Sequence, residues 1–195
     1  AVPENAEYVL EINPYYKDIK EATKLIGQNL GNGSDKYNTS VHADKAKGGN
    51  DKIYAVPRDA TNVLEIDPYY KDIENASQLI GDNLGSQFDK YLTSVLANNG
   101  KIYAAPYNAK YVLEIDPTGD TVTNKLNVTE LGDGSYKYWT SVLAGNGKIY
   151  AAPAYAKKVL EIDPGAPYNK PTRTQAPTTT QAPTEEKITI VVEFI

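Results

Sequence analysis

Paired carboxylates are the first residues in this sequence whose spacing could support chemistry. Glu and Asp recur two positions apart, always followed by proline, at Glu65/Asp67, Glu114/Asp116 and Glu161/Asp163. Two carboxylates side by side can divide the roles of general acid and general base. Because this pair returns in copy after copy, we interpret it as turn chemistry at the end of a strand and expect no catalytic role.

Other reactive residues are scarce. The only histidine, His42, occupies a position where the related segments carry Leu96 and Leu143, so we interpret it as structural or exposed. The chain has no Cys, and no nucleophile elbow, phosphate-cradling glycine motif or HExxH pattern is found. The loop at 116–120 (DPTGD) offers carboxylates to Ca²⁺, but without a specific spacing. We therefore predict no enzyme, no cofactor and no metal site.

Glycosylation is the chemistry that the sequence supports better. Four Asn-x-Ser/Thr sequons occur, at Asn32, Asn38, Asn75 and Asn127. All four lie after an EINP or EIDP segment and before the next TSV segment, so we expect their sugars along an outer rim. Threonines among prolines near the C-terminus resemble an O-glycosylated stalk, the alternative being an unmodified linker: they are Thr172, Thr174, Thr178, Thr179, Thr180 and Thr184.

Composition narrows the classes of partner. A net charge of −5 without a Lys/Arg cluster argues against nucleic acid. No stretch approaches the ~20 apolar residues that a membrane span needs. Tyr is used 16 times against two Phe and one Trp, which suits half-exposed sheets and contact surfaces. The lack of Cys is mild evidence against secretion, and the lack of an initiator Met suggests a processed chain or a fragment.

Internal repeats determine which elements carry these residues. AVPENAEYVLEINPYY at 1–16 returns as AVPRDATNVLEIDPYY at 55–70, and twice more from 104 and 151. The leading prolines are Pro3, Pro57, Pro106 and Pro153, spaced 54, 49 and 47 residues apart. A second block, DKYNTSV at 35–41, recurs from 89 and from 136. Self-similarity at this period is the signature of a repeat architecture.

Each repeat is predicted to consist of short strands and tight turns. TSVLA and KIYAAP flank Asn99-Gly100, and Asn-Gly supplies the positive φ of a two-residue hairpin turn. The VLEIDP strand ends at proline, which cannot donate to a ladder. Residues 17–27 could form a turn or two of helix, whereas the β-branched counterpart at 120–131 favours a strand or loop.

The order NGKIYAAP, VLEIDP, TSVLA resembles kelch-like repeats, and still more the "KIYxxP…VLEIDP" β-propeller-type repeats of extracellular or uncharacterised proteins of algae and other protists. Ala-x-Pro stands where kelch repeats have a Gly-Gly pair. The resemblance implies an all-β fold, a β-propeller-like array of about four ~48-residue repeats, either open or completed by strand exchange. The predicted repeat domain is 1–164, with repeats at about 1–38, 39–92, 93–139 and 140–164.

The two ends of the array do not match. Copy 1 lacks a TSV strand, and copy 4 ends after VLEIDP. A Thr/Pro-rich linker follows at 165–186, and then a predicted strand at 187–195 in which Ile188, Ile190, Val192 and Phe194 alternate. Either this strand folds back or belongs to a further domain, or it adds to the sheet edge of a neighbouring subunit and builds a fibre.

Two functions follow from these features. The first is a structural extracellular glycoprotein of the cell surface, a subunit of a filament or surface coat whose partners are copies of itself and its attached glycans. The second is a lectin-like module that binds glycans or proteins. For the second function, the tyrosine pairs after the EINP and EIDP turns, Tyr15/Tyr16 and Tyr69/Tyr70, could stack on sugars, although copies 3 and 4 lack them.

Overall fold

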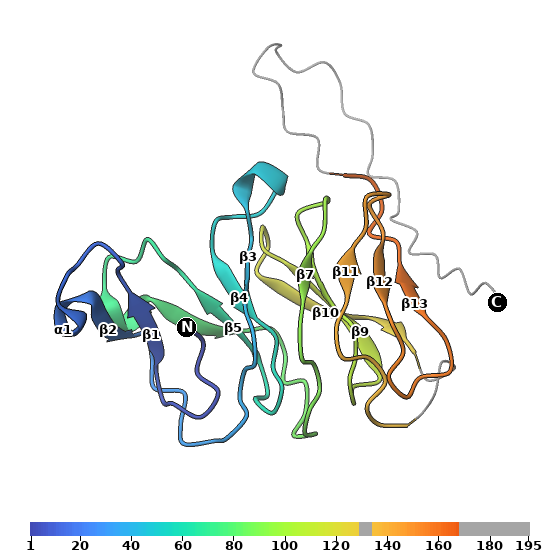
Figure 1. Cartoon of the computed structure of the whole chain (residues 1–195), viewed down its shortest axis with the longest axis horizontal. Coiled ribbons are helices and arrows are strands. Elements are labelled where there is room, and N and C mark those ends of the chain that lie inside the picture. The colour runs from blue at the N-terminus through green and yellow to red at the C-terminus, as the bar shows by residue number, and fades with distance from the viewer. Residues whose placement is uncertain (129–133, 168–195) are drawn as a thin grey trace, which may run out of the picture.

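The protein is all-β, with four antiparallel sheets that succeed one another along the chain and stand side by side (Figure 1). The computed structural model describes residues 1–128 and 134–167. The first sheet contains β1 (Val9–Ile12) and β2 (Thr23–Ile26). The second contains β3 (Val41–His42), β4 (Ile53–Ala55), β5 (Val63–Ile66) and β6 (Ser77–Ile80).

The third and fourth sheets repeat this order. The third contains β7 (Val95–Leu96), β8 (Ile102–Ala104), β9 (Tyr111–Asp116) and β10 (Thr121–Asn127). The fourth contains β11 (Val142–Leu143), β12 (Ile149–Ala151) and β13 (Leu160–Ile162). The short helices are α1 (Ile19–Ala22), η1 (Lys45–Lys47) and η2 (Ile73–Asn75). Residues 17–27 are thus one helical turn followed by a strand, and 120–131 supplies the predicted strand, β10.

The predicted hairpin between β7 and β8 is present, but its turn differs from the expected one. The amide of Ala97 donates to the carbonyl of Lys101 (2.9 Å), which leaves a three-residue loop in which Gly100 has φ of 83°. A two-residue turn of the predicted type needs a positive φ at both of its residues. Asn99 does not have a positive φ, so the prediction of this turn was wrong. The Asn99 side chain is used instead: its Oδ1 accepts from the amide of Lys101 at 3.0 Å.

Apolar side chains gather between neighbouring sheets, and each gathering is called a junction here. The first junction joins the first and second sheets, the second joins the second and third, and the third joins the third and fourth. In the first three VLEI strands the Val faces the following sheet, as Val63 does in the second junction. The Ile faces the preceding sheet, as Ile115 does in the same junction. Each internal sheet therefore has both faces covered.

The Lys-Tyr segments fasten successive repeats. Tyr37, Tyr91 and Tyr138 are almost fully buried. Each hydroxyl donates to a backbone carbonyl at 3.0 Å, on Asn62, Tyr111 and Lys158 respectively. Burial raises the pKa of Tyr138 to about 12, so the hydroxyl stays a donor at neutral pH. These bonds fix the tyrosine rings against the VLEI strand of the following repeat.

The array is open within the described part of the chain. Strands β3 and β11 each contact β7, so the TSV strands meet along one side of the array. The four sheets do not close into a barrel or a ring among the described residues. The first and fourth sheets lie at opposite sides of the molecule in Figure 1. The predicted linker and the predicted strand at 187–195 fall outside the described residues, except for 165–167.

Candidate functional site

The carboxylate pairs separate into two structural roles. Oδ1 of Asp67, Asp116 and Asp163 accepts from the amide two residues further on, at 2.8, 3.0 and 3.0 Å. This is the predicted turn chemistry, and Asn13 makes the same turn at 3.1 Å. The glutamates were not correctly predicted, because they form cross-strand ion pairs rather than turns.

Both carboxylate oxygens of Glu65 are hydrogen-bonded within such an ion pair. Its Oε1 lies 2.6 Å from Nζ of Lys52 and accepts from Gln78 at 2.8 Å, while the Tyr54 hydroxyl donates to Oε2 at 2.9 Å. Burial pushes the pKa of Glu65 up, but these hydrogen bonds outweigh it and hold the pKa below its ordinary value. A fully bonded, ionised carboxylate has no proton to deliver, so it serves to bind β4 to β5.

His42 lies at the surface on β3. Its side chain is 55% exposed, and its Nε2 is 3.9 Å from Oδ1 of Asp51. No group of three or more His, Cys, Asp or Glu that could hold a metal ion occurs in residues 1–128 and 134–167. In the same residues no helix is long and apolar enough to cross a bilayer.

The four sequon asparagines are all exposed. Asn75 ends η2 next to β6, and Asn127 ends β10, so both lie at the sheet edges away from the TSV strands. Asn32 lies in the loop after β2. Asn38 departs from the predicted outer rim, because it comes just before β3 and its Nδ2 donates to the carbonyl of Leu92 (3.2 Å) on the TSV side. The threonines singled out in the tail are outside the described residues.

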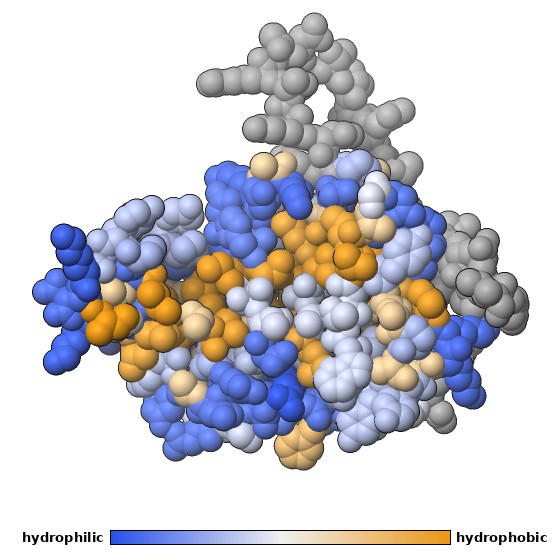
Figure 2. Space-filling view, viewed as in Figure 1, coloured by the Kyte–Doolittle hydropathy of each residue, from blue (hydrophilic) through white to orange (hydrophobic). Residues whose placement is uncertain are grey.

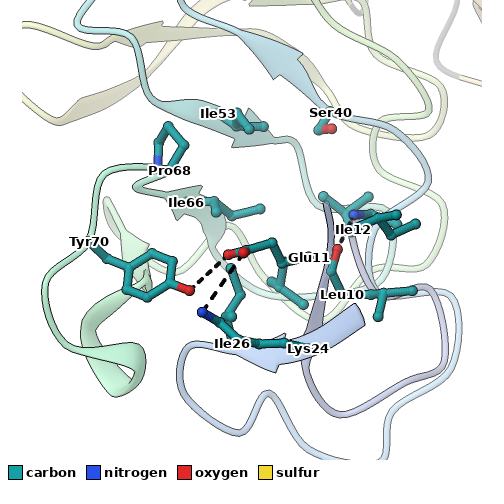
Figure 3. A pocket seen from close by; sticks show the side chains of 13 residues that line it. Leu10, Glu11, Ile12, Lys24, Ile26, Ser40, Ile53, Ile66, Pro68 and Tyr70 are labelled. Carbon is teal, nitrogen blue, oxygen red and sulfur yellow. Dashed lines mark hydrogen bonds and ion pairs between the residues drawn. The ribbon is translucent and has the colours of Figure 1, made fainter. Parts of the chain in front are cut away.

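A groove opens beside the first sheet (Figure 3). It has a volume of about 560 Å³, and the apolar residues of its lining include Ile12, Ile53 and Ile66. The groove lies beside the edge of β1 that faces away from β2, where each of the other sheets carries a Lys-Ile-Tyr-Ala strand. Ala1 occupies part of this edge, because the amide of Leu10 donates to the Ala1 carbonyl (3.1 Å) and the Ala1 amino group donates to the Leu10 carbonyl.

The cross-strand lysine of Glu11 is Lys24 on β2, whereas Glu65 is paired with Lys52 on the β4 side of its strand. Glu11 accepts from the hydroxyl of Tyr70 (2.8 Å) and lies 3.8 Å from Lys24.

The face of the first sheet that points away from the second sheet is called the front face here. It exposes residues that the other copies bury. Ile12 is 55% exposed, whereas its counterparts Ile66, Ile115 and Ile162 are at 5%, 0% and 1%. Leu10 is half-buried, whereas its counterparts in the other three VLEI strands are fully buried. Figure 2 shows apolar surface over several of the sheets. The front face is thus a junction surface without its partner sheet.

The face of the fourth sheet that points away from the third sheet is called the back face here. It exposes the residues that face the following sheet in the other copies. Val159 is 52% exposed, whereas Val9, Val63 and Val112 at the same repeat position are at 2%, 0% and 1%. Tyr150 is half-buried and Ala152 exposed, although their counterparts in the second and third sheets are buried. The two ends of the array therefore present the two complementary halves of a junction.

A second groove lies where the TSV segments of three repeats converge. It has a volume of about 380 Å³, and its lining includes Asn38, Leu92 and Trp139, which share one repeat position. Trp139 is 58% exposed and packs edge-on against Tyr107 at 5.2 Å between ring centres. Arg58 reaches the same groove and is held by Asp89 at 2.6 Å.

Sequence reasoning missed this second groove and looked to the tyrosine pairs instead. Tyr15, Tyr16 and Tyr69 are exposed, but Tyr70 is committed to Glu11, so the pairs do not form matching platforms. The available signal was the single Trp of the chain standing where other copies have Asn or Leu. No family model matches the chain, and no curated protein matches it in sequence.

Proposed function

We propose that this chain is a structural extracellular glycoprotein, a self-assembling subunit of a filament or surface coat. The observation that carries the proposal is the pair of unpartnered ends. Residues buried in every internal copy, represented by Ile12 and Val159, are exposed at the two ends of the array. Large apolar side chains left in this way mark interaction sites.

A propeller-like arrangement of the sheets is part of this proposal. Its support is the repeat order within each sheet together with the contacts of β3 and β11 with β7. In propellers, sheets of this kind are arranged around an axis with one edge strand of each innermost. The sheets of the described residues form an open array, and the proposal assigns its two end faces to assembly.

The predicted strand at 187–195 is proposed as one element of assembly. Lys187-Ile188 repeats the Lys-Ile pair that opens the β4, β8 and β12 strands, at Lys52, Lys101 and Lys148. A strand in that register would bring Lys187 to Glu11 and would place Ile190 opposite Leu10, where it replaces the pairing of Ala1 with Leu10. Strand addition of this type gives affinity through main-chain hydrogen bonds. The groove beside β1 is the matching acceptor.

The surface position of the sequons supports the glycoprotein part of the proposal. Asn32, Asn75 and Asn127 are exposed and lie away from the two end faces, so sugars there would leave assembly free. Glycans on these asparagines imply passage through a secretory compartment. Mass spectrometry of the protein from its natural source would detect them, and unmodified sequon peptides would contradict this part.

The size of the native protein tests assembly. The full chain is expected to form large polymers in sedimentation velocity and negative-stain electron microscopy. The double substitution Ile188→Asp with Ile190→Asp should shorten or abolish them, because two charges would enter an apolar groove. Thr178→Asp with Thr180→Asp adds the same charge at the same spacing in the linker and should leave assembly unchanged. A monodisperse monomer at high concentration would contradict the proposal.

The groove at Trp139 favours a second candidate, a glycan-binding module. An exposed indole beside polar groups is suited to the apolar face of a sugar ring, with Arg58 and Asn38 near enough to orient its hydroxyls. Binding to a glycan array that Trp139→Ala abolishes would support this function. Trp139→Ala binding as strongly as the unaltered chain would contradict it, and Tyr155→Ala, also at an exposed aromatic residue, is the control.

A further inference from the structure

The three internal junctions define what the ends of the array can bind. Each junction has the Val of one VLEI strand on its back side and the Leu and Ile of the next VLEI strand on its front side. In the second junction Val63 shares a cluster with Leu113 and Ile115. The same packing of Val against Leu and Ile therefore occurs three times within one molecule.

An asparagine clasp accompanies this packing. Nδ2 of Asn50, in the second sheet, donates to the carbonyl of Pro117 in the third, at 2.7 Å. Nδ2 of Asn99, in the third sheet, donates to the carbonyl of Pro164 in the fourth, also at 2.7 Å. Each asparagine also holds the tyrosine hydroxyl four residues on. The clasp always runs from one sheet to the turn that ends the VLEI strand of the next.

Asn146 is the same residue in the fourth sheet, and it has no following sheet in the chain that the structure describes. Its Nδ2 donates to the hydroxyl of Tyr150 at 2.9 Å, as the internal copies do. Its Oδ1 accepts from the amide of Lys148, which keeps the amide group in the clasping orientation. The first sheet carries the matching turn, Asn13-Pro14, and Pro14 is exposed.

We infer that the back face of the fourth sheet binds the front face of the first sheet in a second copy of this chain. The contact reproduces an internal junction, with Val159 packed against Leu10 and Ile12 of the partner copy and Asn146 donating to the Pro14 carbonyl. The occupant is a second copy because both halves of the contact occur in one sequence and the internal junctions already join them. This inference rests on the proposed self-assembly and names its contact surfaces.

The contact is heterologous, since the two surfaces differ. Each bound copy leaves one front face and one back face free, so association continues as a filament unless the rotation between copies closes a ring. In Figure 1 the first and fourth sheets, which carry these two faces, lie at opposite sides of the molecule.

Sedimentation velocity of the full chain over a concentration series tests the contact. Val159→Glu places a charge in the junction and should raise the dissociation constant more than about 100-fold. Asn146→Asp keeps the acceptor for Lys148 but removes the donor for Pro14, and should raise it about 10-fold. Phe88→Glu and Asn124→Asp, at exposed positions off both faces, should leave it unchanged.

The outcomes separate this contact from the proposed function. Polymers weakened by both end-face variants, with unchanged melting of the monomer, support the contact. Polymers that resist Val159→Glu but dissolve with Ile188→Asp and Ile190→Asp overturn the contact and keep the filament. A discrete closed oligomer broken by Val159→Glu supports the contact and overturns the filament. A chain that stays monomeric overturns both.

Discussion

At the scale of single residues, the repeats place the same amino acid in different surroundings, and this isolates physical effects. Gly100 and Gly147 close equivalent hairpin loops with φ of 83° and 85°. A Cβ on Gly100 would lie 2.7 Å from the backbone carbonyl carbon of Gly48, whereas a Cβ on Gly147 would meet only the tip of Asn98, at 3.9 Å. The left-handed conformation is common to both, and the clash belongs to Gly100 alone.

Gly147→Ala should therefore lower the free energy of unfolding by about 1–2 kcal/mol, the cost of a left-handed alanine. Gly100→Ala should lower it by about 3 kcal/mol, because the backbone of the neighbouring loop must also move. Urea unfolding of the two variants measures the difference. Equal losses would mean that the loop of the second sheet yields without cost.

The residue scale also shows what could be read from the sequence. Asp67 and its counterparts were predicted as turn residues because Asp before Pro has a local mechanism. The partners of Glu65 could not be predicted, since Lys52 is 13 positions away and meets it only through the register of β4 and β5. Asn99 was assigned to a backbone role, while its structural role depends on the turn of another repeat.

At the scale of elements, the burial of equivalent residues in a strand depends on whether another sheet packs against that strand. Val112 and Val159 occupy the same place in β9 and just before β13, yet one is buried in the third junction and the other is half exposed. The repeats revealed the strands, but not that the internal VLEI strands are buried on both faces, as β5 is. The number of sheets followed from counting copies, whereas the grooves needed the three-dimensional arrangement.

Val112→Ala should lower the free energy of unfolding by about 2 kcal/mol, from lost burial and the cavity left behind. Val159→Ala removes the same atoms from a half-exposed site and should change it by less than about 0.5 kcal/mol in the monomer. Denaturant titrations at a concentration below assembly compare the two. A large loss with Val159→Ala would indicate that its surface is covered within the monomer.

At the scale of the whole molecule, recurring ion pairs make the fold sensitive to acid. Glu65 and Glu161 have pKa values lowered in the folded state, Glu161 chiefly by the hydrogen bond from Lys148. A lowered folded pKa gives stability that is present above the ordinary value of 4.5 and lost as pH falls through the folded value. Asp120 opposes this in part, because burial and the nearby Glu65 raise its pKa.

The urea midpoint should therefore be nearly constant from about pH 7 to 5 and fall below about pH 4.5. Glu65→Gln removes one titrating group and should flatten the fall, while lowering stability at neutral pH. A midpoint that rises on acidification below pH 4.5 would contradict the assignment of these carboxylates. Glu74→Gln, on exposed η2, is the matched control and should leave the slope unchanged.

Separate junctions between successive sheets also have a mechanical consequence. Each sheet contacts its neighbours in the sequence, so a pull on the two ends of the chain loads the junctions in series. The junction that yields first releases one repeat, and about 48 residues extend to roughly 160 Å at ~3.4 Å per residue. A fibre of such units would lengthen under load in discrete steps and shorten again as sheets refold. It would therefore absorb mechanical work before it breaks.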